Sequence, residues 1–400
     1  MNNFESNESK KGLYKNLPLG CKLFGQGVSS KTINQKIQYW KECTEDIDVF
    51  LILAGSRTAE LEGISAAGIT AESRKDTAAA DGELFLQGPS PYRKYPMPPL
   101  PAGISPALIS YVASKFLKST PSVIAIGLSS FPRYPHLQIE TPPLGPSDCI
   151  TTGRSMEYQR VKALWEKGFS MGLNLRRTLL ITECVPGGTT TAQAVLTGLG
   201  VNVEGLIGGS LRNPPFALKR AIVMKGLEAA DLRNKSEPEK ILAAVGDPFQ
   251  PFAAGLLLGA REVGRNVLLG GGSQMLAVLA LALSSLNPAS RNEFLEGLAL
   301  ATTSWLLEEN SDDLFIPSSL IKLTNNIENF FRVGIVGFSS GLKFNNCKNK
   351  CLRDYEIGYI KEGVGAGALS FLAQLQGVKL EELITSCDAA ADKFFAINSL

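Results

Sequence analysis

The stretch Thr178-Leu-Leu-Ile-Thr-Glu183, with the turn Pro186-Gly-Gly-Thr-Thr-Thr191 after it, indicates the fold of this chain. A short, nearly continuous apolar run is typical of a strand buried on both faces of a parallel sheet. The turn brings glycines and hydroxyls to the start of a predicted helix over residues 192–199, with Thr189 or Thr190 as its cap. The same order of apolar run and glycine- or serine-rich turn recurs at Asp48–Ala54, Ser122–Gly127, Asn266–Leu269 and Arg332–Gly337.

These strands, separated by helical patterns, predict an α/β fold. We expect a mostly parallel Rossmann-like sheet with helices on both faces and a smaller helical part from the chain ends. Further helices are predicted over residues 215–227, 275–286 and 368–375. We expect a single domain over residues 1–400, with residues 1–45 and 376–400 peripheral. The turns after parallel strands meet at one edge of an open sheet, so we expect the ligand site there.

Composition favours a globular cytoplasmic enzyme. Hydrophobic residues make up 44% of the chain, and the formal net charge is only +2. Such a balance argues against a broad nucleic-acid surface or a membrane surface as partner. Seven cysteines, an odd number in a long chain, favour a reducing compartment. Residues 1–11 are polar, so we expect no signal peptide, and the apolar run 275–286 is too short to span a bilayer.

Two other features of the sequence, a cysteine pair and a proline-rich passage, predict no functional site. Cys347 and Cys351 lack further zinc ligands at matching spacing, and the sole histidine, His136, lies far from them in sequence, so we expect no metal. The passage Pro89–Pro106 contains seven prolines. Proline lacks the N–H that regular structure needs, so we expect an extended surface arm.

Two glycine-rich turns could bind an anion. The first, residues 182–191, leaves free N–H groups at a helix start, although it lacks the Gly-Lys-Ser/Thr ending of a Walker loop. The second, Ile207-Gly-Gly-Ser-Leu-Arg212, precedes Lys219, whose ammonium group is a mobile point charge suited to phosphate. The plain alternatives are a well-capped turn and a solvated helix face.

A third segment, Lys361-Glu-Gly-Val-Gly-Ala-Gly367, offers a carboxylate beside alternating glycines. Its glycines fall short of the dinucleotide-binding fingerprint. Reduced solvation would raise the pKa of Glu362, as a general base requires. The alternative is an ordinary surface glutamate before a helix.

Together these three segments, in this order, resemble the nicotinate-nucleotide–dimethylbenzimidazole phosphoribosyltransferase family, over about residues 45–375. Glu183–Thr191 is similar to that family's Glu-Met-Gly-Ile-Gly-Asn-Thr-Thr loop. Residues 207–210 with Ala217–Ala221 resemble its Val-Gly-x-Gly-Thr-Gly turn and Leu-Ala-Arg-Lys helix. Lys361–Gly367 resembles its Leu-Gly-Glu-Gly-Thr-Gly-Ala motif, whose glutamate is the catalytic base.

The resemblance implies a pentosyltransferase that moves the phosphoribosyl group of nicotinate mononucleotide to an aromatic base, a benzimidazole or a purine. It implies a homodimer and no cofactor. Glu362 would be the base and Glu183 a second acidic group in the site. Residues 55–58 and 63–68 would shape the pocket for the aromatic base. The residues that would bind substrate are Gly187, Gly188, Thr189, Gly208, Gly209, Lys219, Ser339, Ser340, Gly363 and Gly365.

The chain also departs from the family pattern. Gly-Gly-Thr-Thr replaces Gly-Asn-Thr-Thr, no histidine follows His136, and residues 55–68 are only loosely similar. These departures leave the acceptor base open and indicate a divergent branch. Two alternatives stay open: a non-catalytic nucleotide-binding or regulatory protein on the same fold, and an NAD-linked oxidoreductase, which the missing fingerprint disfavours.

Overall fold

The computed structural model describes residues 16–232, 236–309 and 318–398, and at its centre lies one eight-stranded sheet. The strand order is β1-β8-β7-β6-β5-β2-β3-β4. Neighbours from β8 to β4 are parallel, and β1 runs antiparallel to β8. The predicted α/β class and mostly parallel sheet are therefore confirmed. The strands are β1 (Lys22–Phe24), β2 (Ile47–Ala54), β3 (Ser122–Ile126), β4 (Leu137–Gln138), β5 (Thr178–Cys184), β6 (Val267–Gly270), β7 (Leu298–Thr302) and β8 (Gly337–Ser339).

The five predicted strands correspond to β2, β3, β5, β6 and β8, but the bounds of the last were wrong. The preceding helix, α12 (Ser319–Phe331), ends at Arg332, whose φ of 56° lies in the left-handed region. The paired strand therefore begins only at Gly337. β7 was not predicted, because its sequence Leu-Ala-Leu-Ala-Thr consists mostly of residues that favour helices.

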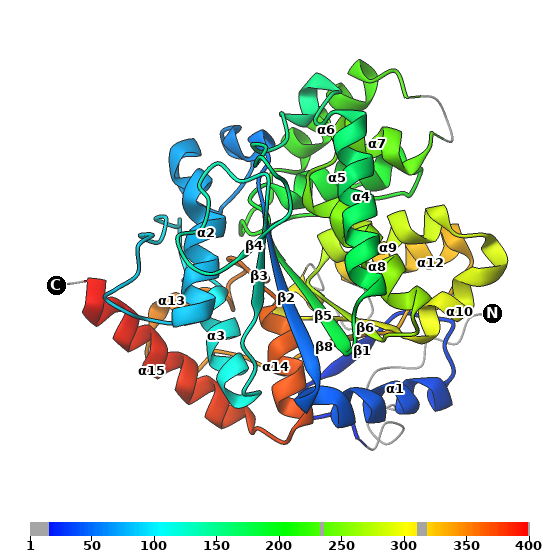
Figure 1. Ribbon diagram of the computed structural model, residues 1–400. Helices are drawn as coiled ribbons and strands as arrows, with labels where there is room; N and C mark the ends of the chain where they lie inside the picture. The colour runs from blue at the N-terminus through cyan, green and yellow to red at the C-terminus, as the bar shows by residue number, and fades with distance from the viewer. Residues whose placement is uncertain (1–15, 233–235, 310–317, 399–400) are drawn as a thin grey trace.

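Helices cover both faces of the sheet, as predicted (Figure 1). One face carries the apolar cluster that includes α4, α5, α8, α9 and α12, and the other packs on α1, α2, α3, α14 and α15. The chain ends supply β1, α1 and α15. The remaining bounds are α1 (Ser30–Glu42), α2 (Ala71–Gln87), α3 (Ala107–Phe116), α4 (Tyr158–Leu173), α5 (Gly188–Gly198), α6 (Phe216–Ala229), α7 (Pro238–Val245), α8 (Phe249–Glu262), α9 (Ser273–Ser285), α10 (Arg291–Glu296), α11 (Ser304–Leu307), α13 (Lys350–Arg353), α14 (Ala366–Leu375) and α15 (Leu380–Asn398).

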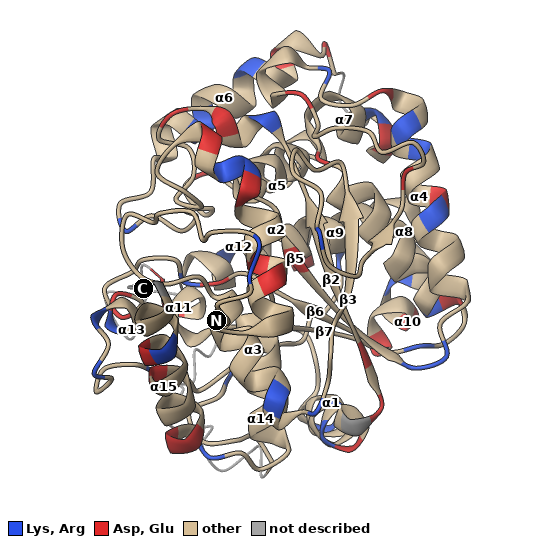
Figure 2. Cartoon of the chain, turned by 60° about the vertical axis from the view of Figure 1, so that its left-hand side comes forward, with Lys and Arg blue, Asp and Glu red and all other residues tan. Residues whose placement is uncertain are grey.

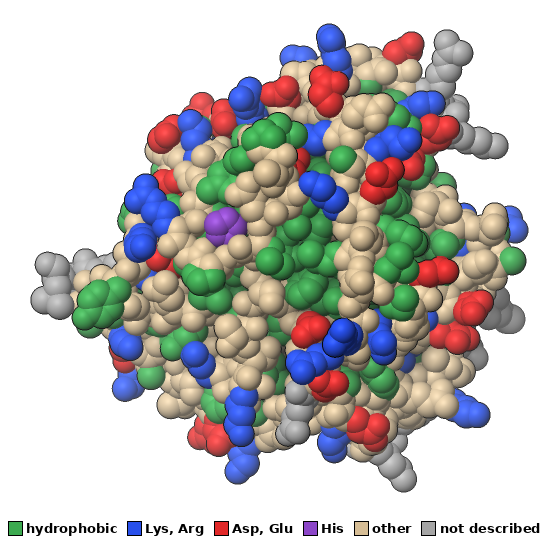
Figure 3. Space-filling model, viewed as in Figure 1, with side chains coloured by type: hydrophobic (Ala, Val, Ile, Leu, Met, Phe, Trp, Pro, Cys, Tyr) green, Lys and Arg blue, Asp and Glu red, His purple; other side chains and the backbone are tan. Residues whose placement is uncertain are grey.

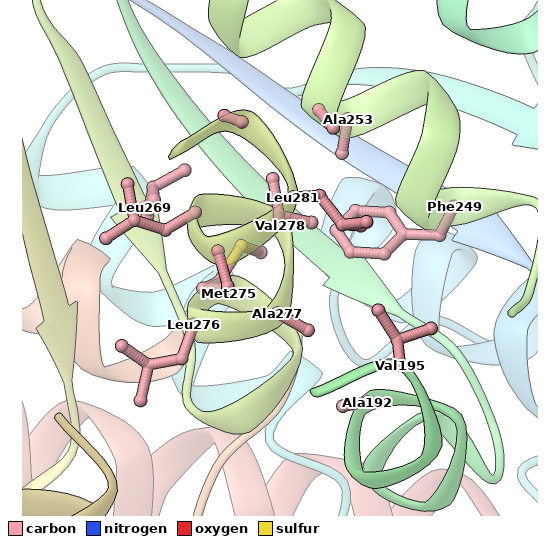
Figure 4. Packing of buried hydrophobic residues seen from close by; sticks show 14 of the residues in the cluster. Ala192, Val195, Phe249, Ala253, Leu269, Met275, Leu276, Ala277, Val278 and Leu281 are labelled. Atoms are coloured by element: carbon pink, nitrogen blue, oxygen red, sulfur yellow. The ribbon is translucent and has the colours of Figure 1, made fainter. Parts of the chain in front are cut away.

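The four helices predicted from apolar spacing correspond to α5, α6, α9 and α14. In α9 the residues from Met275 to Leu283 are apolar and fully buried. They pack among Leu269 of β6, Phe249 of α8 and Val195 of α5 (Figure 4). Within the described residues, no helix is both long enough and apolar enough to span a membrane.

Charged residues occur along the outer helices, for example α4, α6 and α7 (Figure 2). On the face drawn in Figure 3, basic and acidic side chains are mixed around a broad hydrophobic area. This mixing agrees with the small net charge of the chain.

The strand order fixes where a ligand can bind. The chain runs outward from β2 to β3 and β4, and then returns to place β5 on the other side of β2. From β5 it proceeds in the opposite direction through β6, β7 and β8. In open α/β sheets, ligands bind in the crevice outside the carboxyl ends of the strands where the order reverses. Here that point lies between β2 and β5.

Candidate active site

Two adjoining cavities open at the carboxyl ends of the strands, with empty volumes of about 910 and 580 Å³. The larger one we call the acidic cavity, because Asp81, Glu183 and Glu362 line it among mostly apolar and small residues. Among the described residues, its lining contains no lysine, arginine or histidine. The smaller one we call the lysine cavity, because Lys361 lines it and Lys219 lies directly behind its wall.

Both catalytic candidates lie where the two cavities meet. Glu183 ends β5 beside Cys184, Glu362 precedes α14, and each lines both cavities. Gly208, Gly363 and Thr189 are also shared. The turns at Gly187, Gly208 and Gly363 therefore meet at one cleft, as predicted, but not every predicted glycine or serine turn reaches it. A ligand that spans both cavities would pass between the two carboxyl groups.

Glu362 is held by four donors. Its Oε2 accepts hydrogen bonds from the Thr302 hydroxyl (3.0 Å) and the Thr303 N–H (2.7 Å). Its Oε1 accepts from the N–H groups of Gly363 (3.1 Å) and Gly367 (3.3 Å). Burial raises the pKa of Glu362, although these hydrogen bonds oppose the rise. The result is a carboxylate in a fixed orientation that is more basic than one in water.

Glu183 has a different environment. Burial raises its pKa to about 8, and the nearby carboxyl groups of Asp247, Glu362 and Asp81 add to the rise. Asp247 is itself fully buried, and its Oδ2 accepts from Thr191 Oγ1 (2.5 Å) and Gln274 Nε2 (2.8 Å). Because its carboxyl pKa lies near 8, Glu183 is mostly protonated at neutral pH. It can then donate a hydrogen bond, while Glu362 accepts one.

Two buried lysines hold the turn of residues 207–211 from opposite sides. Lys219 Nζ donates to the carbonyl oxygens of Ile207 (2.8 Å) and Gly208 (3.3 Å) and to Thr189 Oγ1 (3.0 Å). Lys361 Nζ donates to the Gly209 carbonyl (2.9 Å) and pairs with Glu309 at 2.7 Å. Burial lowers the pKa of Lys219 to about 7. The neighbouring groups therefore supply too little negative charge to offset the cost of burying the Lys219 ammonium group.

The segment before Glu362 is strained. Ile360 and Lys361 have φ values of 65° and 62°, in the left-handed region that non-glycine residues rarely occupy. The Ile360 N–H donates to the Ser210 carbonyl oxygen at 2.8 Å, which ties the segment to the lysine-held turn. Strain of this kind persists where tertiary contacts over-determine it, and it clusters at functional sites.

Helix N-termini add positive potential to the cavities. α5 begins after Gly187, which has φ 78°, and its first turn lines the acidic cavity. Ser273 and Gln274, the first residues of α9, line the lysine cavity. Neither helix has a side-chain cap. In α5 the N–H groups of Gly188 and Thr190 already donate to the carbonyl oxygens of Val185 and Gly187, so the start of α9 is the better place for an anion. The predicted cap at Thr189 or Thr190 is wrong, because Gly187 takes the N-cap position and both threonines lie in the first turn.

The structure brings most predicted substrate-binding residues to the cavities, but not all. Gly187, Gly188, Thr189, Gly208, Gly209 and Gly363 line one or both. Lys219 reaches the site through Thr189 and the turn. Gly365 lies below the site, where an added Cβ would come within 2.2 Å of Thr182 Cγ2. Ser339 and Ser340 are fully buried at the end of β8 and line neither cavity, so the structure does not bring them to the site.

Of the two segments predicted to shape the pocket for the aromatic base, one lies at the acidic cavity and the other does not. Residues 64–67 line the acidic cavity. Residues 55–58 do not: Gly55 and Ser56 line a separate small cavity, and Ser56 caps the short helix Arg57–Glu60. This turn follows β2, whose end is covered by the loop through Ser147, the residue with which Ser56 forms a β-bridge.

The proline-rich passage is irregular, as predicted, but it is not simply a surface arm. Met97, Pro98, Leu100, Ser105 and Pro106 line the acidic cavity. Tyr95 and Ile104, between the prolines, are buried against the body of the protein. Proline-fixed backbone makes such a wall without regular hydrogen bonding.

Sequence patterns missed Asp81, Ser105 and Cys184 of the acidic cavity and Glu309 of the lysine cavity. For Asp81 the sequence did contain one signal. This carboxylate lies in the small-residue run Ala78-Ala-Ala-Asp-Gly82, which has no amphipathic pattern that would predict a solvent-exposed position for it. The others carried none, because they come from segments that only the fold brings to the site.

Comparison with known proteins agrees with this architecture. A family model described as phosphoribosyltransferase matches residues 117–301. A UPF0284 protein of Prochlorococcus marinus strain MIT 9313 is 52% identical over 379 residues, covering 95% of this chain and 94% of that one. A UPF0284 protein of Parasynechococcus marenigrum strain WH8102 is 50% identical over 380 residues, covering 95% of each chain.

Solved structures show the same fold at low sequence identity. CobT from Thermus thermophilus superposes with a TM-score of 0.55 at 16% identity, covering 88% of this chain and 91% of that chain. A nicotinate-nucleotide-dimethylbenzimidazole phosphoribosyltransferase from the same organism gives 0.52 at 16% identity, covering 86% and 82%. The chain therefore belongs to the UPF0284 family, and its fold is that of the nicotinate-nucleotide–dimethylbenzimidazole phosphoribosyltransferases.

Proposed function

We propose that this protein transfers the phosphoribosyl group of nicotinate mononucleotide to a benzimidazole-type or purine base and so forms the lower-ligand nucleotide of a cobamide. The observation that carries the proposal is the meeting, at one boundary, of two buried carboxyl groups with a lysine-held turn and a helix N-terminus. The acidic cavity offers carboxyl groups and apolar walls, whereas the lysine cavity, which Glu183, Glu309 and Glu362 also line, adds Lys361 and the start of α9. A nucleotide with a cationic ring and an anionic phosphate matches this arrangement.

Binding follows from these charges. The phosphate would lie at the lysine cavity, against the N–H groups of α9 and the turn that Lys219 holds. The pyridinium ring and the acceptor base would both lie toward the acidic cavity, on opposite faces of the ribose carbon, where carboxyl groups favour the cationic ring. Phosphate binding energy would then fix the ribose carbon at the boundary, between Glu183 and Glu362.

The chemistry needs one proton transfer and one displacement. Glu362 takes the proton from the ring N–H of the acceptor base, and the electron pair thus released makes the other ring nitrogen nucleophilic. That nitrogen attacks the ribose carbon from the face opposite to nicotinate. The bond from the ribose carbon to the pyridinium nitrogen breaks, and its electron pair returns to the ring. Nicotinate needs no general acid to leave, because its positively charged ring nitrogen becomes neutral when the bond to the ribose carbon breaks.

The two carboxyl groups have separate roles in this scheme. Glu362 takes the proton on Oε1, whose hydrogen bonds from Gly363 (3.1 Å) and Gly367 (3.3 Å) are the longest of its four, and the incoming N–H replaces one of them. Burial raises the pKa of Glu183 to about 8, so this carboxyl group stays mostly neutral. It therefore adds no full negative charge beside the phosphate. Environments that separate the pKa values of two neighbouring carboxyl groups are typical of acid-base sites.

The direct test is to incubate the purified protein with nicotinate mononucleotide and either dimethylbenzimidazole or adenine. We expect nicotinate and the new nucleotide to appear in equal amounts, as measured by liquid chromatography and mass spectrometry. Nucleotide binding without product from either base would refute the transferase and favour the non-catalytic nucleotide-binding alternative.

A further inference from the structure

Asp81 is a buried carboxylate in the acidic cavity to which the proposed mechanism assigns no task. It lies on α2 and is 5% exposed. It lines the acidic cavity but not the lysine cavity, whereas Glu183 and Glu362 line both. Asp81 therefore lies on the acidic-cavity side of the boundary, outside the lysine cavity where the phosphate is proposed to bind.

The protein uses only part of the hydrogen-bonding capacity of the Asp81 carboxylate. Its Oδ1 accepts one hydrogen bond from Ser105 Oγ at 2.5 Å, and its Oδ2 accepts one from the Cys184 thiol at 3.2 Å. Both donors are neutral, and a thiol is a weak donor. The Arg93 guanidinium acts on Asp81 electrostatically, but the two side chains form no ion pair in the described part of the chain. Each carboxylate oxygen can accept about two hydrogen bonds, so acceptor capacity is left over toward the cavity.

The walls near Asp81 fit a flat aromatic ring. Ile64, Ala67, Met97 and Leu100 line the same cavity. They come from the loop after β2 and from the proline-rich passage, which also supplies Ser105. The cavity thus combines apolar walls for a ring with one polar acceptor at the remote end. This combination is typical of sites that fix the orientation of an apolar ligand by a few polar contacts.

We propose that Asp81 selects an acceptor base that carries an N–H donor on its six-membered ring, such as an amino group. This inference rests on the proposed function, because it names the acceptor of that reaction. An amino group can donate to the spare acceptor capacity of Asp81. A methyl group at the same ring position would cover the carboxylate, exclude water and leave a buried acceptor without its partner. Sites built to hydrogen-bond a substrate discriminate strongly against analogues that lack the donor.

The test uses two bases that differ only at one ring substituent: an aminobenzimidazole and a methylbenzimidazole substituted at the same carbon. Their affinities for the protein are measured by calorimetry without any nucleotide. We expect the wild type to bind the amino base about 10-fold or more tightly, the effect of one hydrogen bond to a charged group. Asp81→Leu, which removes both acceptor oxygens, should abolish or reverse this preference, whereas Asp81→Asn, which keeps the shape and one acceptor oxygen, should retain part of it.

Glu72→Gln, which replaces an exposed carboxylate on the same helix, is the matched control and should leave both affinities unchanged. A wild type that binds the methyl base as tightly as the amino base, or binds neither, would overturn the inference. So would an unchanged preference in folded Asp81→Leu. Because no nucleotide is present, failure of the transferase reaction is a separate result: discrimination that depends on Asp81 without turnover would overturn only the proposed function.

Discussion

The acidic cavity and the lysine cavity share a wall and two carboxyl groups, but they differ in the cations beside them. In the acidic cavity three carboxyl groups line the space, and the described lining supplies no cation. Beside the lysine cavity both ammonium groups are engaged: Lys219 binds backbone carbonyls, and Lys361 binds carbonyls and Glu309. The lysines therefore shape a turn, and in the described part of the chain they leave Glu183 and Glu362 without an ion pair. Because Lys361 and the start of α9 line only the lysine cavity, the two cavities offer different surroundings to the two ends of a ligand.

The largest effect is expected for a substitution of Glu362, which lies at the boundary between the two cavities. Glu362→Gln keeps the shape of the side chain but cannot accept the proton, so turnover should fall by about 100-fold or more. Donor nucleotide affinity should be nearly unchanged, because the base acts on the acceptor. Steady-state rates and calorimetry check the two parts. Glu381→Gln, exposed on α15, is the control. A near-normal rate in folded Glu362→Gln would remove this residue from the chemistry.

The next effect should be confined to the lysine cavity. Lys219→Met removes the charge but keeps the apolar stem, and we expect nicotinate mononucleotide binding to weaken by about 1–3 kcal/mol. Binding of free nicotinate, which lacks the phosphate, should hardly change. Lys225→Met, at an exposed lysine on the same helix, serves as control. Equal loss for both ligands in calorimetry would mean that the mutation disrupts the site as a whole.

A third prediction concerns Gly367, which packs against the two threonines that hold Glu362 at the boundary of the cavities. A Cβ added at Gly367 would lie 2.0 Å from the Thr302 carbonyl carbon and 2.2 Å from the Thr303 nitrogen, so Gly367→Ala must push α14 away from β7. We expect a loss of about 1–3 kcal/mol in the free energy of unfolding. Turnover should also fall, because both threonines hold Glu362. Chemical denaturation checks the first part. Gly145→Ala, where an added Cβ meets nothing within 4 Å, should be neutral.

The smallest effect is a change in the pH dependence of stability. Folding raises the Glu183 pKa from 4.5 to about 8, so the folded state binds its proton more tightly than the unfolded state does. Between these values the unfolded state binds fewer protons, and this contribution to stability falls as the pH rises. Glu183→Gln removes the titration, so stability should decline less from about pH 5 to about pH 8. Melting curves over this range that parallel those of the wild type would contradict the raised pKa.

The sequence by itself determined the class of fold and the main anchors of the site. Apolar runs followed by glycine-rich turns predicted five strands of the sheet, because a buried parallel strand needs apolar residues on both faces. The order of three motifs pointed to Glu183 and Glu362, which the structure places at one boundary. Those motifs are local, since glycines and a carboxylate within a few residues already define a turn and its chemistry.

Tertiary structure alone decided the rest. β7 was missed because leucine and alanine do not distinguish a short buried strand from a helix, yet its end supplies Thr302 and Thr303 to Glu362. Asp81 and Ser105 reach the acidic cavity only because α2 and the proline-rich passage pack beside β5. Ser339 and Ser340 follow a strand as the motif would suggest, but they are buried away from both cavities. Local sequence sets what a turn can do, whereas the crossing of distant segments sets which side chains face the ligand and how strongly burial shifts their pKa.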